Sequence, residues 1–402
     1  MNHSRLQLVV ITALVAMLFA GCVEETGSLY DPSHSLGRAP VISSMTSTLR
    51  ADSAIAAYDT LTITGANFAP MTQDNWVFFN SGVRTPFQAT ETELRVRPTL
   101  NFGDSVNIRI GTRLSDSLSL GPVYYKVGRG VASFSGLSDS SAFAMATDAA
   151  GNVYVSIGVN GLDAGVFRAT PEGGRAPYAN PSIGISNWTG LRMGPGGYLY
   201  AVRGVRAVYR ANPGGGALTA WAQITSPAGV LINDIEFDEA GNLWAVGSNP
   251  SIFCIRPNRT VKASPIAANI RSARIFNGYL YYSAVVGGLN QIWRAQMLGD
   301  SLAAPEVYFD FDAAYGALGY VPQAITFSSD GYLFIATNTP EGVVIVSPSK
   351  TASAPYFEYD TDMSPTMKWL AWGSDNSLYG SSGSGALLRF HTRQTSAPYY
   401  SR

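Results

Sequence analysis

The sequence predicts an all-β protein in which a β-sandwich of about 90 residues is followed by a six-bladed β-propeller. One phrase, a polar turn leading into an apolar and aromatic strand, occurs as DAAGNVYV (148–155) and returns five more times. The steps between successive turns are 46, 44, 37, 53 and 45 residues. A period of 40 to 50 residues with several short strands per repeat is typical of β-propellers. The marker position of the turn is held by Gly151, Gly197, Gly241, Gly278, Gly331 and Asn376.

A second phrase repeats in step with the first, which supports the same period. It is an apolar strand that ends in a turn, as in GVFRATPEGG (165–174) and AVYRANPGGG (207–216). Arginine holds one position of this strand in four repeats, and we expect it to lie across the sheet face and reach neighbouring carbonyls or acids. A basic ring is the alternative. The position is held by Arg168, Arg210, Cys254, Arg294, Ile345 and Arg389.

Length and composition restrict the classes of function. A chain of 402 residues exceeds what one core holds, so two domains are expected. Charged residues make up 14% of the chain, well below the usual value of about 25%. The net charge is −1, which argues against a nucleic-acid partner because no basic field attracts phosphates. Two cysteines and three histidines show no spacing of a metal site.

The N-terminus predicts export. Arg5 precedes an apolar run over residues 6–18, which suits the core of a signal peptide and is short for a membrane span. The sequence FAGC that ends at Cys22 resembles a bacterial lipobox, in which the cysteine receives a diacylglyceryl group. An ordinary signal peptide is the alternative. We therefore expect a lipoprotein signal peptide over residues 1–21 and a membrane anchor at Cys22, in the outer membrane or at the cell surface of a bacterium.

Two segments precede the repeats. Residues 22–39 contain few core residues and several turn formers, so they are expected to form a flexible stalk. Residues 40–127 contain short strands separated by frequent turns. Apolar and polar residues alternate over 92–96 and 106–110, as in the half-buried strands of a sandwich.

The second of these segments resembles the IPT/TIG family of immunoglobulin-like domains, through LTITGANF (61–68) and NWVFFN (75–80) together with the strands that follow. The resemblance implies that Gly65 and Asn67 shape a turn, and that Phe68 and Phe78 pack inside. It implies a spacer or a binding surface and no chemistry. A rigid arm that carries the propeller is therefore the favoured role.

Each repeat within residues 128–402 fits four strands, the first repeat being FAMATD, NVYVSIG, AGVFRAT and APYAN. These phrases resemble the NHL and SMP-30/gluconolactonase-like six-bladed propellers. Either APYYSR (397–402) or GVASFSG (130–136) completes the last blade. One position after the turn carries an apolar residue in all six repeats, and we expect this residue to pack in the core between neighbouring sheets. It is held by Val153, Leu199, Leu243, Leu280, Leu333 and Leu378.

The resemblance also implies an enzyme alternative, a metal-dependent hydrolase or lactonase, or a lyase. Lactonase-like propellers hold a divalent cation such as Ca²⁺ in the tunnel, through acidic and amide side chains at the starts of inner strands. Here those positions offer no carboxylate and include a lysine, and Asp234 is the one nearby acid. We therefore expect no metal, no cofactor and no catalytic residue. The positions are Phe143, Thr189, Asn233, Ser272, Gln323 and Lys368.

Aromatic residues give the better functional signal. Trp188 and Trp369 stand near strand starts, where they are expected to face the tunnel mouth beside amide and hydroxyl side chains. Such a depression suits stacking on, and hydrogen bonding to, a sugar or peptide. The sequence therefore predicts non-catalytic binding of a glycan, a peptide or an envelope protein. A scaffold within an envelope complex is a third possibility.

Overall fold

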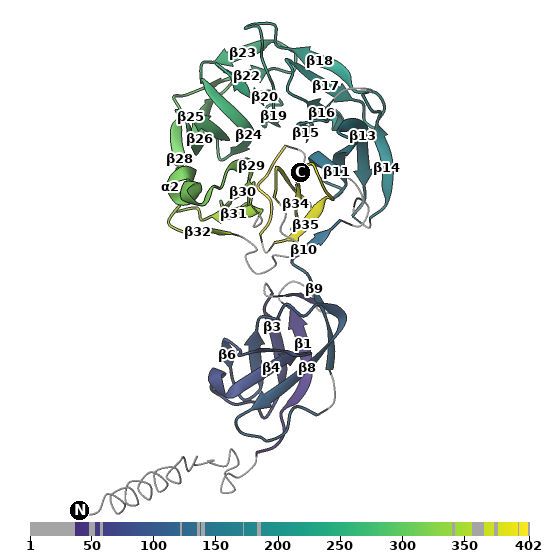
Figure 1. The fold of residues 1–402 in the computed structure, drawn as a ribbon, viewed down its shortest axis with the longest axis vertical. Helices are drawn as coiled ribbons and strands as arrows, with labels where there is room; N and C mark the ends of the chain where they lie inside the picture. The colour runs from purple at the N-terminus through teal and green to yellow at the C-terminus, as the bar shows by residue number, and fades with distance from the viewer. Residues whose placement is uncertain are drawn as a thin grey trace, which may run out of the picture.

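The computed structural model describes residues 37–47, 53–56, 59–120, 123–134, 137, 141–171, 173–182, 186–339, 342–355, 366–373, 377–392 and 394–400. The predicted signal peptide, Cys22 and the stalk up to residue 36 lie outside the described residues. In the described ranges, none of the helices has the length and apolar character that crossing a membrane requires. The strands of these ranges form eight sheets, two in the N-terminal part and six in the ring that follows (Figure 1).

The N-terminal part is a β-sandwich. One sheet has the order β1 (Val41–Ser47), β3 (Leu61–Ala66), β7 (Glu93–Val96), β6 (Gln88–Ala89). The other has the order β2 (Ser53–Ile55), β9 (Val123–Gly128), β8 (Gly103–Thr112), β4 (Asn75–Phe79), β5 (Gly82–Arg84), with β2 parallel to β9. Apolar residues at alternate positions of both sheets bury themselves in one shared core, because successive side chains of a strand point to opposite faces. Fully buried members include Leu61, Ile63, Val77, Phe79 and Ile108.

The turn after β3 depends on two special residues. A Cβ atom at Gly65 would stand 1.8 Å from the carbonyl oxygen of Val41, so only glycine fits there. Asn67 has a φ of +62°, a left-handed conformation that asparagine tolerates better than most residues. Phe68 is buried as expected. The expectation that Phe78 packs inside is wrong: strand alternation turns it away from the centre, and its neighbour Phe79 occupies the core.

Six four-stranded blades follow, in the order that the repeats predict. Blade 1 contains β11 (Ser141–Thr147), β12 (Val153–Val159), β13 (Leu162–Ala169) and β14 (Arg175–Ala179). Blade 2 contains β15 (Gly190–Met193), β16 (Leu199–Val202), β17 (Ala207–Ala211) and β18 (Thr219–Gln223). Blade 3 contains β19 (Asp234–Phe237), β20 (Leu243–Val246), β22 (Ile252–Ile255) and β23 (Val261–Ser264).

The later blades carry small additions. Blade 4 contains β24 (Ala268–Phe276), β25 (Tyr279–Val286), β26 (Leu289–Leu298) and β28 (Glu306–Phe309), and β21 (Ser248–Asn249) and β27 (Ser301–Leu302) extend its sheet. The helix α2 (Phe311–Tyr315) leads to blade 5, which contains β29 (Pro322–Phe327), β30 (Leu333–Thr337), β31 (Val343–Val346) and β32 (Ser353–Pro355). Blade 6 contains β33 (Trp369–Trp372), β34 (Ser377–Ser381), β35 (Leu388–His391) and β10 (Val131–Ser133).

The six blades close into a ring around a central axis (Figure 1). Each inner strand contacts the inner strand of the next blade, from β11 through β15, β19, β24 and β29 to β33, and β33 returns to β11. The apolar site after each turn, Val153 in blade 1 and leucine in the other five, is completely buried. The predicted all-β fold with a six-bladed propeller is therefore confirmed.

The ring closes through the strand that enters the propeller. β10 pairs with β35 in antiparallel fashion, with Val131 opposite Phe390. The segment GVASFSG therefore completes blade 6. Residues 397–400 instead contact blades 5 and 3, because the Ala397 amide donates to the Phe327 carbonyl at 3.1 Å and the Tyr400 ring contacts the Phe237 ring.

The Tyr399 hydroxyl anchors this C-terminal segment, since it accepts from the Phe327 amide at 2.7 Å and lies 2.9 Å from Thr326 Oγ1. We expect Tyr399→Phe to lower the free energy of unfolding by about 1 kcal/mol, the usual value of one net hydrogen bond. Urea unfolding of the two proteins measures this. Tyr400→Phe is the control because, within the described residues, Tyr400 makes a ring contact with Phe237, at 5.6 Å between ring centres, and no hydrogen bond. Equal effects of the two substitutions would contradict the assigned anchor.

The arginines of the third strands lie on the sheet faces, as expected. The guanidinium of Arg210 stands 3.9 Å from the centre of the Tyr198 ring. Arg294 Nε donates to Glu306 at 2.7 Å, and Arg389 Nε donates to Ser377 Oγ at 2.8 Å. They therefore form no basic ring in the tunnel. Cys254 at the equivalent position is buried, and this burial raises the pKa of its thiol to about 12.

Candidate functional site

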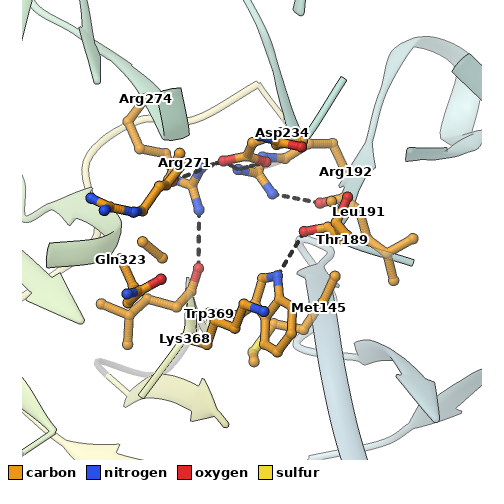
Figure 2. A pocket seen from close by; sticks show the side chains of 16 residues that line it. Met145, Thr189, Leu191, Arg192, Asp234, Arg271, Arg274, Gln323, Lys368 and Trp369 are labelled. Atoms are coloured by element: carbon orange, nitrogen blue, oxygen red, sulfur yellow. Dashed lines mark hydrogen bonds and ion pairs between the residues drawn. The ribbon is translucent and has the colours of Figure 1, made fainter. Parts of the chain in front are cut away.

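A cavity of about 290 Å³ opens where the inner strands of the propeller begin (Figure 2). All six blades contribute to it through their innermost strand or the residue just before that strand, so residues far apart in the sequence meet there. Several of them were predicted from the repeat alone. The lining includes Thr189, Asn233, Asp234, Ser272, Gln323, Lys368 and Trp369.

The mouth of this cavity combines hydrogen-bonding and aromatic side chains. Trp369 spans toward blade 2, and its indole Nε1 donates to the Thr189 carbonyl at 2.6 Å. Lys368 is exposed, and its Nζ lies 4.8 Å from the centre of the Trp369 ring. The Asn233 side-chain amide donates to the Ile270 carbonyl at 3.0 Å. That these residues contact a ligand stays a prediction.

Two predicted residues do not line this cavity. Phe143 packs beside Trp369, with ring centres 5.6 Å apart, and so supports the wall from behind. Trp188 is fully buried, so the expectation that it faces the mouth is wrong. It ends the connection between the first two blades, where it contacts the Tyr209 ring at 5.2 Å and the Arg203 guanidinium at 4.4 Å. Packing between blades therefore determines its orientation.

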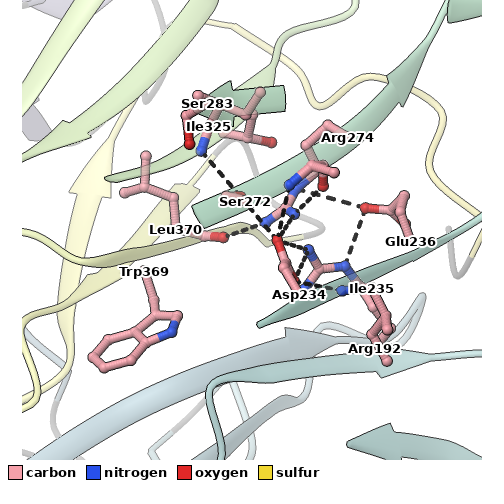
Figure 3. Close-up of polar contacts among 12 residues, drawn as sticks. Arg192, Asp234, Ile235, Glu236, Ser272, Arg274, Ser283, Ile325, Trp369 and Leu370 are labelled. Atoms are coloured by element: carbon pink, nitrogen blue, oxygen red, sulfur yellow. Dashed lines mark hydrogen bonds and ion pairs between the residues drawn. The ribbon is translucent and has the colours of Figure 1, made fainter. Parts of the chain in front are cut away.

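A network of buried charges forms the floor of the cavity (Figure 3). Asp234 accepts from Arg192 Nη2 at 3.1 Å, from Arg274 Nη1 at 3.0 Å and from Ser272 Oγ at 2.8 Å. Glu236 accepts from Arg192 Nε at 3.0 Å and lies 3.6 Å from Arg274 Nε. Each of the four charged side chains is at most 13% exposed. Two arginines and two carboxylates thus neutralise one another inside the tunnel.

The backbone completes this network. The amides of Ile235 and Ala273 donate to Asp234 at 2.9 and 3.1 Å, and Arg274 Nη2 donates to the Leu370 carbonyl at 3.0 Å. The network therefore links blades 2, 3, 4 and 6 across the axis. Burial raises the pKa of Glu236, and Arg192 opposes that rise. Burial alone would lower the pKa of Arg192, but the two carboxylates raise it above its usual value.

The donor set does not fit a bound divalent cation. A hard cation such as Ca²⁺ needs several oxygen ligands with negative charge. Both oxygens of Asp234 are already bound to arginine, serine and backbone donors, and Lys368 adds a positive charge at the mouth. No group of three or more His, Cys, Asp or Glu residues in the described part of the chain is arranged to hold a metal ion.

Arg271 is a further cation at the mouth that the sequence analysis missed. Its Nη1 donates to Asn290 Oδ1 at 3.0 Å and to the Pro322 carbonyl at 3.1 Å, and both of these acceptors are neutral. Burial lowers the pKa of Arg271, and the more distant Asp312 opposes this effect. The hydrogen bonds of Arg271 therefore leave its positive charge without a carboxylate partner within the described residues.

The sequence analysis also missed Arg192, Glu236 and Arg274. Counting back from each turn selected Thr189, Asn233 and Ser272 in these blades, and the three missed residues lie two or three positions further along the chain. A signal for them exists in the sequence. Each is a charged residue beside apolar residues in a short strand, GLRM, DIEF or SARIF, and a charge in a buried strand needs a partner.

Comparisons with known proteins yield likeness at the level of fold. No family model and no curated protein matches the chain. An auxiliary nutrient binding protein from Bacteroides thetaiotaomicron has a TM-score of 0.54 at 11% identity, over 90% of this chain and 98% of that one. One from Bacteroides ovatus has a TM-score of 0.52 at 10% identity, over 90% and 98%. A putative gluconolactonase has a TM-score of 0.51 at 16% identity, over 67% and 94%.

The extent of these matches is informative about architecture. The propeller from Val131 onward makes up about two thirds of the chain, as does the part matched by the gluconolactonase. The match to the nutrient binding proteins is longer and takes in most of the sandwich as well. SMP-30/gluconolactonase-like and NHL-type propellers are therefore structural neighbours of this chain. Identities of 10 to 16% show a shared fold only.

Proposed function

We propose that this chain is a bacterial cell-envelope lipoprotein, anchored through Cys22, whose propeller mouth binds a glycan, a peptide or an envelope protein without changing it chemically. One observation carries the proposal. The two carboxylates of the tunnel, Asp234 and Glu236, are both bound by arginines, so neither is free to hold a cation or to act as a base. The mouth above them offers amide, cationic and aromatic side chains, which suit recognition.

The remaining parts have supporting roles in this proposal. The sandwich, as an IPT/TIG-like spacer, and the stalk hold the propeller away from the membrane. The match to the nutrient binding proteins supports this assignment, since it covers 90% of this chain and thus extends beyond the propeller. The name of those proteins describes binding.

A propeller hydrolase, lactonase or lyase is the second candidate, and the likeness to a putative gluconolactonase is what favours it. In that case Ca²⁺ would be the expected cofactor. The donor set opposes it, because the only carboxylate that lines the described mouth is Asp234, and this side chain is held in ion pairs.

A glycan and peptide array with the full chain in detergent tests the proposal. We expect binding to members of one chemical class, and mass spectrometry of the recovered ligand should find it intact. Turnover of a sugar lactone that requires added Ca²⁺ would contradict the proposal and favour the enzyme. A variant with Cys22→Ser should lose its lipid and partition into the aqueous phase, which tests the anchor separately.

A further inference from the structure

The mouth carries more positive than negative charge. Four cationic side chains, those of Arg192, Arg271, Arg274 and Lys368, line the cavity, and Asp234 is the one carboxylate among its described lining residues. Glu236 in the floor network neutralises one more charge. Two cations, Arg271 and Lys368, therefore remain without a bound carboxylate in the part of the chain that the structure describes.

Three side chains at the mouth also offer hydrogen-bond donors that no carboxylate of the described residues accepts. Arg271 has donated only to neutral oxygens, and Lys368 Nζ faces an aromatic ring and no acid. Gln323 lies on β29, which contacts both β24, the strand of Arg271, and β33, which begins directly after Lys368. Its side-chain amide makes no hydrogen bond within the described residues. Asp312, the nearest further acid to Arg271, is occupied by Asn290, whose backbone amide donates to it at 2.7 Å.

These features suit an anion that is planar and accepts several hydrogen bonds. A carboxylate accepts from lysine, from amides and from the planar fork of a guanidinium, and such charge-assisted bonds are about twice as strong as neutral ones. A cavity of about 290 Å³ is at the small end for ligand sites, so it takes one ring or end group of a larger molecule. The Thr189 and Asn233 side chains across the mouth suit the hydroxyl groups of a sugar ring.

We propose that the mouth binds the carboxylate-bearing unit of an acidic saccharide, with Lys368, Gln323 and Arg271 on the carboxylate side. This inference rests on the proposed binding function of the mouth. It adds the class of ligand, because it predicts that the mouth binds an acidic sugar such as a uronic acid more tightly than a neutral sugar. Arg192 and Arg274 in the floor contribute no net charge, because Asp234 and Glu236 balance them.

Isothermal titration of the full chain with tri-galacturonate and with its methyl ester tests this inference. The two probes share every hydroxyl group and differ in charge. We expect the acid to bind about tenfold or more tightly than the ester, and its affinity to fall as NaCl rises from about 0.05 to about 0.5 M. Lys368→Gln should weaken the acid about tenfold and leave the ester unchanged, whereas Lys368→Arg should retain binding.

Lys350→Gln is the matched control. Lys350 Nζ stands 5.0 Å from the Tyr308 ring, in the same relation to an aromatic as Lys368, but at a different site on the propeller. It should leave both affinities unchanged. If the acid and the ester bind equally and substitutions at the mouth weaken both, the inferred preference for an anion is wrong. The mouth would then still be a binding site. If a peptide binds through its free C-terminal carboxylate and tri-galacturonate does not bind, the inference that the ligand is a saccharide is wrong.

Discussion

Asp234→Ala should lower the free energy of unfolding of the propeller by about 3–5 kcal/mol, because it leaves two buried arginines with fewer partners. Arg192 and Arg274 would then share Glu236, at 3.0 and 3.6 Å, and Ser272 would lose its acceptor. Urea unfolding followed by tryptophan fluorescence measures the loss. Six of the seven tryptophans lie in the propeller, so the signal reports that part of the chain.

Glu239→Ala is the control for this prediction. Glu239 is an acid in the turn that follows the same strand, and it is exposed. Its removal should change the free energy of unfolding by no more than about 0.5 kcal/mol. A loss below about 1 kcal/mol for Asp234→Ala would show that the charge network is not needed to hold the blades together.

Val131→Asp should be nearly as damaging, with a loss of about 3 kcal/mol or more, because it places a charge in the core of the closing blade. Val131 is completely buried among Phe390, Trp372 and Leu378. The substitution weakens the contact that joins the first strand of the ring to the last. Urea unfolding again measures the effect, and limited proteolysis should reveal early cleavage around β10.

Ser133→Asp is the matched control for closure through β10. Ser133 lies two residues further along the same short strand but is exposed. The same new charge should therefore change the free energy of unfolding by no more than about 0.5 kcal/mol. Similar losses for the two substitutions would contradict closure through β10, because in the described pairing only Val131 of the two is buried in the core.

The repeat made the fold predictable from the sequence. A turn that starts with Asp148 or Asp238 fixes its own geometry: Asp238 accepts from the Asn242 amide at 2.8 Å and from Trp244 Nε1 at 2.9 Å. Gly241 in the same turn has a φ of +80°, which glycine adopts at little cost. A glycine with positive φ recurs at this turn position in blades 1 to 5, so the requirement appears in the sequence as a period.

Ring closure and the tunnel floor were less predictable for physical reasons. GVASFSG and APYYSR both have the composition of a short strand, and only pairing with β35 distinguishes them. The tunnel floor joins Arg192, Asp234 and Arg274, which come from three blades, and no local pattern specifies which charge meets which. Trp188 failed as a mouth residue for the same reason, since contacts with the next blade decide its direction.

The central claim is that the propeller mouth is the binding surface, and a variant that fills it tests this claim most directly. The Gln323 side chain lines the mouth without a hydrogen bond to the described residues, so Gln323→Trp should occupy the cavity with little effect on folding. The measurement is the Kd of the best array ligand for the wild type and for this variant. The account predicts a Kd higher by about a factor of ten or more. An unchanged Kd would contradict it.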